Sequence, residues 1–194
     1  MTNPQPARQL FTVIIYSENA VGLLNRVSNT LTRRGINIED VSAGVSSVPS
    51  IHKLTFTCWS DRPTMEKVVR QFEKIIEVLK ASLYTDDEIV YQEIALYKVP
   101  TAELMGEKNL EEIIRRHSAR ILEIAPEYTV IEKTGRSTEI DALLECLRKH
   151  HVRQFVRSGR VCVTKSPVEL IDIFLQKQAE RRLKTSKSLF NNKC

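Results

Sequence analysis

The chain has 194 residues, of which 42% are apolar and 27% are charged, a composition typical of a folded globular protein. Its formal net charge of +5 equals the net charge of residues 177–194, so the rest of the sequence is balanced. A basic tail without base-reading or stacking groups gives little support to nucleic-acid binding. No window approaches the roughly 18 unbroken apolar residues that a membrane-spanning helix needs.

The N-terminus and the cysteines together predict a cytoplasmic protein. Residues 1–6 are polar with two prolines, unlike a secretory signal. The four cysteines include no C-x-x-C pair, which favours reduced thiols over a disulfide framework or a zinc site. We therefore expect no metal site and no association with a membrane.

The first half of the sequence predicts the element order β-α-β-β-α-β. An apolar strand over Leu10–Tyr16 precedes a helix over residues 21–34, which Gly35 ends. The remaining predicted elements are strands at 38–46 and 51–59, a helix that Asp61 precedes and whose apolar stripe reaches residue 79, and a strand at 81–84. Two helices and four strands in this order are typical of an antiparallel sheet with both helices on one face.

The turn before the first predicted helix has the features of an anion-binding site. Asn19 is placed to cap the helix, and Gly22 then falls in its first turn. Glycine costs a helix about 1 kcal/mol relative to alanine, so Gly22 favours the close approach of a ligand to the backbone. A helix N-terminus attracts anions, and the carboxylate of an amino acid is one.

The second half repeats this plan without obvious sequence identity. Its predicted elements are a strand at 89–99, a helix at 109–117, strands at 119–124 and 128–133, a helix capped by Ser137 or Thr138, strands at 152–157 and 160–164 that pair across Ser158-Gly159, and a terminal helix at 167–184. The expected fold is α+β, with two ferredoxin-like βαββαβ domains in tandem. The expected boundaries are a flexible N-terminus at 1–9, domains at 10–85 and 89–165, and a basic helical tail at 166–194.

Three segments of the sequence carry a resemblance to a known family. They are Glu18-Asn19-x-x-Gly22-x-Leu24-x-Arg26-Val27, Arg34-Gly35-x-Asn37-Ile38-Glu39 and Glu93-Ile94-Ala95-Leu96-Tyr97-Lys98-Val99. The chain resembles the regulatory (small) subunit of acetolactate synthase over residues 10–165. The resemblance implies that the first domain is an ACT domain that forms homodimers. It also implies a non-catalytic protein, which activates a catalytic subunit and confers feedback inhibition by a branched-chain amino acid, most often valine.

The resemblance also assigns an effector site and cofactors. It places Asn19 and Gly22 of one protomer opposite Asn37 and Ile38 of its partner, and Leu23 and Ile38 would line an apolar pocket for a branched side chain. No cofactor is expected on this chain itself. Thiamine diphosphate, Mg²⁺ and FAD are expected in the catalytic subunit.

Two alternatives to the regulatory function need residues or motifs of their own. An acylphosphatase of the same fold needs a phosphate-binding arginine after the first strand, where this chain has Ser17-Glu18-Asn19. A free-standing, amino-acid-responsive regulator of transcription could use the basic tail on DNA, but no helix-turn-helix can be read from the sequence. The transcription regulator remains the alternative prediction.

Overall fold

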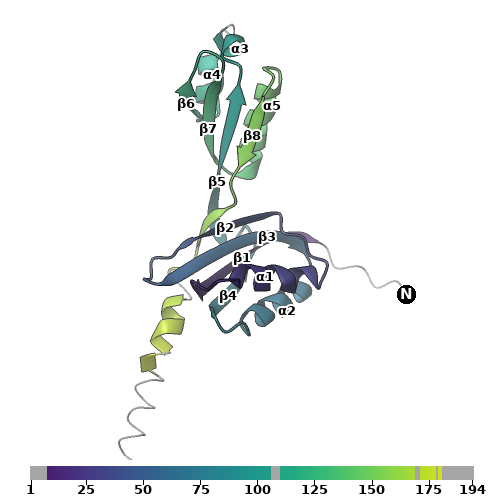
Figure 1. The fold of residues 1–194 in the computed structure, drawn as a ribbon, viewed down its shortest axis with the longest axis vertical. Helices are drawn as coiled ribbons and strands as arrows, with labels where there is room; N and C mark the ends of the chain where they lie inside the picture. Colours follow the sequence, from purple (N-terminus) through teal and green to yellow (C-terminus); the bar gives the residue numbers. More distant parts are fainter. Residues whose placement is uncertain (1–7, 106–109, 169–170, 178, 181–194) are drawn as a thin grey trace, which may run out of the picture. The chain divides into compact units, whose positions relative to one another are not determined.

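A computed structural model describes residues 8–105, 110–168, 171–177 and 179–180 (Figure 1). The chain divides into two compact units, one formed by residues 1–90 and 163–194 and the other by residues 91–162. Most of the predicted flexible N-terminus and much of the predicted basic tail lie outside the described residues. Within the tail, residues 171–177 are helical.

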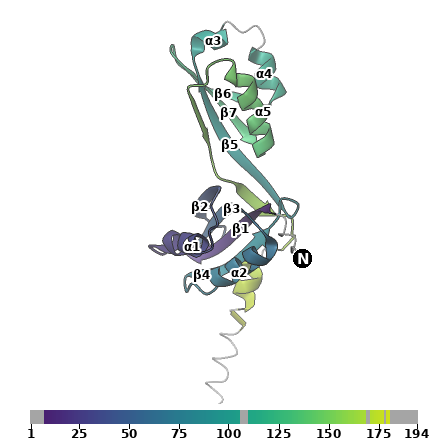
Figure 2. The same ribbon diagram turned by 90° about the vertical axis from the view of Figure 1, so that its right-hand side faces the viewer.

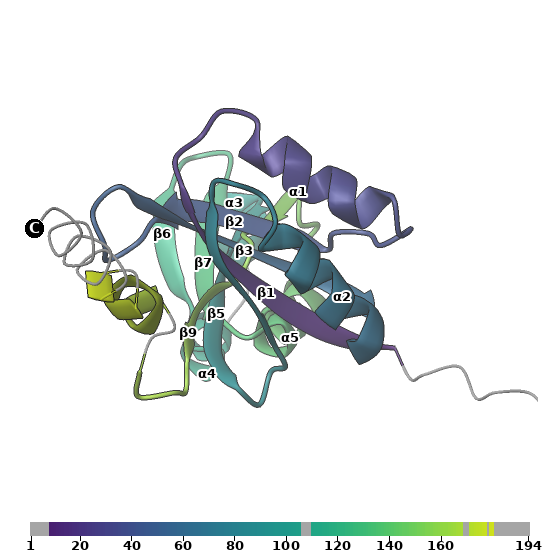
Figure 3. The ribbon, with the colours of Figure 1, turned by 90° about the horizontal axis from the view of Figure 1, so that it is seen from below.

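The first unit contains a four-stranded antiparallel sheet with two helices. Its elements are β1 (Gln9–Glu18), α1 (Leu23–Thr32), β2 (Asp40–Val45), β3 (Ile51–Ser60), α2 (Arg62–Phe72) and β4 (Val78–Tyr84). The strand order is β2-β3-β1-β4. Both helices lie side by side on one face of the sheet, as Figure 3 shows. This arrangement confirms the predicted βαββαβ plan.

Strand β1 is the centre of the first unit. It pairs with β3 along its whole length and with β4 from Thr12 to Ser17. Residues 11–17 of β1 are all buried, although they point alternately to the two faces of the sheet. The helices add Leu23, Val27 and Leu31 from α1 to the core. Met65, Val68 and Phe72 of α2 complete this core.

Both helices of the first unit are shorter than the sequence pattern predicts. The residue that precedes α1 is Gly22 and not Asn19, so the predicted asparagine cap is wrong. Helix α2 ends at Phe72, where the pattern predicts continuation to Leu79. Residues 73–77 instead turn the chain back, because β4 begins at Val78 and pairs with β1. Ile76, which the pattern placed on the apolar stripe, is therefore exposed.

The second unit repeats this topology. Its elements are β5 (Ile89–Val99, whose first two residues belong to the first unit), α3 (Thr101–Met105), α4 (Leu110–Arg116), β6 (Arg120–Ile124), β7 (Thr129–Gly135), α5 (Ser137–Arg148), β8 (Gln154–Arg157) and β9 (Val161–Thr164, whose last two residues belong to the first unit). The strand order β6-β7-β5-β8 matches that of the first sheet, element for element. The predicted hairpin across Ser158-Gly159 is wrong, because β8 and β9 each pair with β5 and not with each other. Helix α3 was not predicted.

The core of the second unit lies between its sheet and its helices. Figure 2 shows α4 and α5 on the same face of the sheet, and residues of both helices pack on a buried cluster that includes Tyr97 and Ile131. The hydroxyl of Tyr97 donates a hydrogen bond to the carbonyl of Ile140 at 2.8 Å, which ties β5 to α5. Burial raises the pKa of Tyr97, so this hydroxyl keeps its proton in the folded chain.

The start of α2 generates a testable pH dependence. Asp61 caps the helix by accepting a hydrogen bond from the Thr64 N–H at 2.8 Å, and this bond lowers the pKa of the Asp61 carboxyl. A lowered pKa in the folded state stabilises the fold above about pH 4, the ordinary pKa of aspartate, and this contribution is lost as the pH falls further. We expect Asp61→Asn to be less stable than the original chain at pH 7, with a difference that shrinks below pH 4. Urea unfolding at both pH values measures this difference, and a pH-independent difference would contradict a contribution from the ionised carboxylate of Asp61.

Candidate functional site

The turn between β1 and α1 has a backbone that only glycine adopts readily. Gly22 has a φ of +79°, in the left-handed region, and lies directly before the first residue of α1. Asn19 and Gly22 are both exposed. Asn19 does not cap α1, and no hydrogen bond links its amide to any other residue that the structure describes. The first turn of α1 thus offers backbone N–H groups and a carboxamide to a ligand from solvent.

A guanidinium group beside this turn was missed by the sequence analysis. A Cβ atom on Gly22 would lie 3.8 Å from Nη1 of Arg26, and Nη2 of Arg26 pairs with Oε1 of Glu77 at 2.7 Å. The spacing of four residues could have revealed it, since residues i and i+4 share one face of a helix. Arg26 adds a positive charge to the end of α1 that already favours anions.

The other predicted site residues lie elsewhere in the chain. Leu23 is buried in the first core, and Ile38 is half-buried against that core. Asn37 is exposed after Gly35, the residue whose φ of +63° turns the chain at the end of α1. Helix α1 has 10 residues, which corresponds to about 15 Å, and it separates Gly22 from Asn37. A single chain therefore does not bring the two halves of the predicted site together.

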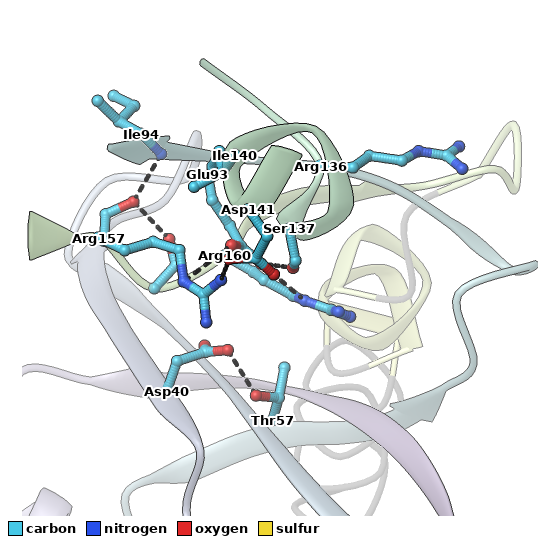
Figure 4. A network of polar contacts seen from close by, with 12 residues as sticks. Asp40, Thr57, Glu93, Ile94, Arg136, Ser137, Ile140, Asp141, Arg157 and Arg160 are labelled. Atoms are coloured by element: carbon cyan, nitrogen blue, oxygen red, sulfur yellow. Dashed lines mark hydrogen bonds and ion pairs between the residues drawn. The ribbon is translucent and has the colours of Figure 1, made fainter. Parts of the chain in front are cut away.

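The second unit contains a polar group around the buried Glu93 and Arg160 that we call the Glu93 cluster, formed by Glu93, Ser137, Arg157 and Arg160 (Figure 4). The Ser137 hydroxyl donates to Oε1 of Glu93 at 2.7 Å, and Nε of Arg160 lies 3.4 Å from the same oxygen. Nε of Arg157 lies 3.4 Å from Oε2 of Glu93. The side chains of Glu93 and Arg160 are each only 4% exposed. The predicted capping role of Ser137 is wrong, because Arg136 is the cap residue and Ser137 contacts Glu93 instead.

The Glu93 cluster connects three parts of the second unit. It joins β5, the start of α5 and the β8–β9 turn, and Nη1 of Arg157 also reaches Oδ1 of Asp141 at 3.3 Å. The guanidinium of Arg160 lies 3.9 Å above the centre of the Tyr91 ring. A buried carboxylate that is matched by two guanidinium groups and a hydroxyl is suited to holding elements together.

The described residues give little support to a metal site, a membrane-spanning helix or a reactive thiol at Cys58. Within the described ranges, His, Cys, Asp and Glu nowhere gather in a group of three or more that could hold a metal ion. Among the same residues, no helix is long and apolar enough to cross a bilayer. Cys58 is buried, and its burial, followed by the charges of Glu39 and Asp40, raises its pKa to about 12. This thiol therefore stays protonated at neutral pH.

Both halves of the chain match models of one protein family. Residues 13–80 match the "AHAS small subunit-like ACT domain", and residues 92–166 match the "Small subunit of acetolactate synthase". The acetolactate synthase small subunit of Mycobacterium leprae is 31% identical over 156 residues, which cover 80% of this chain and 92% of that protein. A probable acetolactate synthase small subunit of Methanothermobacter thermautotrophicus is 28% identical over 85% of this chain and 97% of its own length.

A solved structure agrees with these sequence matches. The crystal structure of an acetolactate synthase small subunit from Thermotoga maritima is 26% identical and superposes with a TM-score of 0.74. The superposition covers 82% of this chain and 99% of that one. The similarity therefore extends over both βαββαβ units.

Removing the charge of Glu93 tests whether the Glu93 cluster stabilises the second unit. Glu93→Gln removes the charge of the carboxylate that pairs with the buried Arg160, and breaking a buried ion pair typically costs about 3–5 kcal/mol of stability. Urea unfolding followed by circular dichroism measures this loss. The matched control is Glu112→Gln, which breaks an exposed ion pair with Arg116 on α4 and should cost less than about 0.5 kcal/mol. Equal effects of the two substitutions would show that the Glu93 cluster does not stabilise the second unit.

Proposed function

Because the chain belongs to the family of acetolactate synthase small subunits, which are regulatory and non-catalytic, we propose that it activates a catalytic subunit and confers feedback inhibition by a branched-chain amino acid. The catalytic subunit would hold thiamine diphosphate, Mg²⁺ and FAD. The observation that carries the feedback function is the first unit, an ACT domain whose α1 begins at a left-handed glycine. The family favours this function over the alternative of a free-standing transcription regulator.

The start of α1 is suited to the carboxylate of the effector. Free N–H groups in the first helical turn and the helix macrodipole favour an anion there. The guanidinium of Arg26 lies near the same point, and Gly22 leaves room for close approach because it has no side chain. The exposed amide of Asn19 supplies a further donor.

The ammonium group and the side chain of the effector would be bound by a second protomer. Asn37 lies about one α1 length, about 15 Å, from Gly22, which is too far for one amino acid to span. Strand β2 is an edge strand, and its Val41 and Val45 are 43% and 82% exposed. An edge strand with exposed apolar side chains can pair with a second copy. A homodimer formed through the ACT domains would bring Gly22 of one protomer to Asn37 of its partner.

Valine is the effector that we propose first. An apolar surface near Ile38, which is half-buried at the α1–β2 turn, would contact the branched side chain. Discrimination between valine, leucine and isoleucine is expected to be weak, since one methylene is worth about 1–3 kcal/mol. Binding would shift the regulator between an activating and a non-activating state, and a coupling of about 1–3 kcal/mol is enough for useful feedback.

A charge at position 22 tests the carboxylate end of this site. Gly22→Asp places a negative charge where the effector carboxylate is expected and offers Arg26 a competing partner, so inhibition of the holoenzyme by valine should weaken at least tenfold. Activation without valine should persist. Gly22→Asn is the matched control, because asparagine tolerates the same left-handed backbone without the charge. Full valine sensitivity in the Asp variant would refute the assignment.

Mixed dimers test whether the site is shared between protomers. Gly22→Asp and Asn37→His should each abolish feedback in homodimers. When the two variants are mixed, each heterodimer contains one doubly altered site and one site with both original residues. We therefore expect valine sensitivity to return in part on mixing, as measured by inhibition of the reconstituted holoenzyme. No recovery in dimers that are confirmed to be mixed would argue for a site within one chain.

A further inference from the structure

A hollow of about 390 Å³ lies on the helical layer of the first unit, and we call it the α1–α2 hollow. The residues that line it come from the last turns of α1 and α2 and from the positions that follow them: Thr30, Arg33, Arg34, Gln71 and Lys74. The volume lies in the lower part of the usual 300–1,000 Å³ range of ligand pockets, which suits a small ligand. None of the five residues belongs to the effector site proposed above.

The packing of α1 against α2 brings these residues together. Near the start of α1, Arg26 pairs with Glu77, which lies beyond the end of α2. After the end of α1, Nε of Arg34 donates a hydrogen bond at 3.2 Å to Oε1 of Gln71, which lies within α2. Contacts therefore move back along α2 as they move forward along α1, so the two helices are antiparallel. Figure 3 shows them side by side, and the hollow lies at their boundary.

The lining of the hollow carries three positive charges and no negative one. Arg33, Arg34 and Lys74 are all exposed, and no carboxylate is among the lining residues. No ion pair within 4 Å joins any of these three side chains to a residue that the structure describes. Their charges are therefore available to a ligand from solvent.

The carboxylates that follow α2 do not neutralise the hollow. Glu73 is paired with Lys80, and Glu77 is paired with Arg26. Residues 19–38, which include the whole of α1, contain no aspartate or glutamate. The positive charge of the hollow is thus not matched by α1 or by these two paired carboxylates.

A simpler role for the three cations is to complement the C-terminal ends of the two helices. Each helix end carries about half a negative charge, and basic residues near it are stabilising. The ends of α1 and α2 together thus account for about one of the three positive charges. A net charge of about +2 remains for a ligand.

The hydrogen bond to Gln71 also prepares Arg34 for an oxyanion. It uses Nε, so the two terminal amino groups of the guanidinium keep their donors. A guanidinium donates two parallel hydrogen bonds to two oxygens of one phosphate group. The Thr30 hydroxyl donates to the carbonyl of Arg26 at 2.9 Å, so it forms a wall of the hollow and not a further donor.

We propose that the α1–α2 hollow binds a small polyanion that carries at least two phosphate groups. Arg34 binds one phosphate group with its terminal amino groups, while Arg33 and Lys74 balance the charge of the other. Two phosphate groups match the three cations better than a single dianion does. The site goes beyond the proposed function, because it requires neither the effector residues nor a partner protomer.

Inorganic pyrophosphate and tripolyphosphate are the probes that test the proposal. Each is titrated into the full chain by isothermal titration at constant ionic strength, and we expect saturable heat. Sulfate, a single dianion, should bind at least about tenfold more weakly than pyrophosphate at the same ionic strength.

Variants assign the binding to the hollow. Arg34→Gln and Lys74→Gln should each weaken pyrophosphate binding at least about tenfold without loss of the fold, since both side chains are exposed. Arg34→Lys keeps the charge without the paired donors, so its affinity should fall between those of the original chain and Arg34→Gln. Arg115→Gln is the matched control, because it removes an exposed arginine from α4 in the second unit and should leave binding unchanged. Circular dichroism checks that each variant is folded.

The outcomes separate this site from the β1–α1 turn and from unspecific attraction to a basic chain. Gly22→Asp should leave pyrophosphate binding unchanged, because Gly22 lies at the opposite end of α1. The proposal is overturned if neither probe gives saturable heat, or if Arg115→Gln weakens binding as much as Arg34→Gln does. It is also overturned if Gly22→Asp abolishes binding while Arg34→Gln and Lys74→Gln preserve it. None of these outcomes depends on feedback by valine.

Discussion

The fold of the first unit depends on the burial of one strand, β1, between two neighbours. Seven consecutive residues of β1 are buried, and a strand without solvent on either face needs hydrogen-bonding partners along both of its edges. Pairing with β3 and β4 satisfies that need. The connections that contain α1 and α2 both cross the same face of the sheet. The turn into α1 is consequently placed at one end of β1, and Arg8 enters beside Trp59 at the other. The position of this strand thus sets where the start of the proposed effector site lies.

The same plan in the second unit is stabilised by different chemistry. Strand β5 places Ala95, Tyr97 and Val99 toward the helices, as expected for an apolar face, but Glu93 continues that face. A buried carboxylate needs both charge and hydrogen-bond partners. Residues from α5 and the β8–β9 turn supply both at Oε1 of Glu93, whereas Oε2 faces the charge of Arg157 without a hydrogen-bond partner among the described residues. The cluster thus connects β5, α5 and the β8–β9 turn, which lie far apart in the sequence. Such a cluster favours one arrangement of β8 and β9 along β5.

The sequence was sufficient for the element order but not for the contacts that depend on tertiary structure. Period-2 and period-3.6 patterns predicted both βαββαβ units, and β5 was predicted with its observed bounds. The apolar stripe of α2 was extended too far because Leu79 fits both a helix and the strand that β1 requires. The Ser158-Gly159 dipeptide suggested a hairpin, whereas the pairing of both flanking strands with β5 decides the outcome. Asn19 and Gly22 were predicted from the sequence as site residues, whereas Arg26 was missed, although its spacing of four residues from Gly22 could have revealed it.

The burial of Glu93 and Arg160 makes their ion pair less sensitive to dissolved salt than the more exposed charges at the start of α1. Side chains that are 4% exposed are largely shielded from mobile ions, so the cluster should hold at high ionic strength. Arg26 and Glu77 are 43% and 26% exposed, and at 0.15 M salt the screening length is about 8 Å. Counter-ions therefore compete at the start of α1 and at the exposed Arg157, but not at the buried pair of Glu93 and Arg160. Ionic strength becomes a means of weakening the anion recognition that we propose for this turn while the fold around it stays intact.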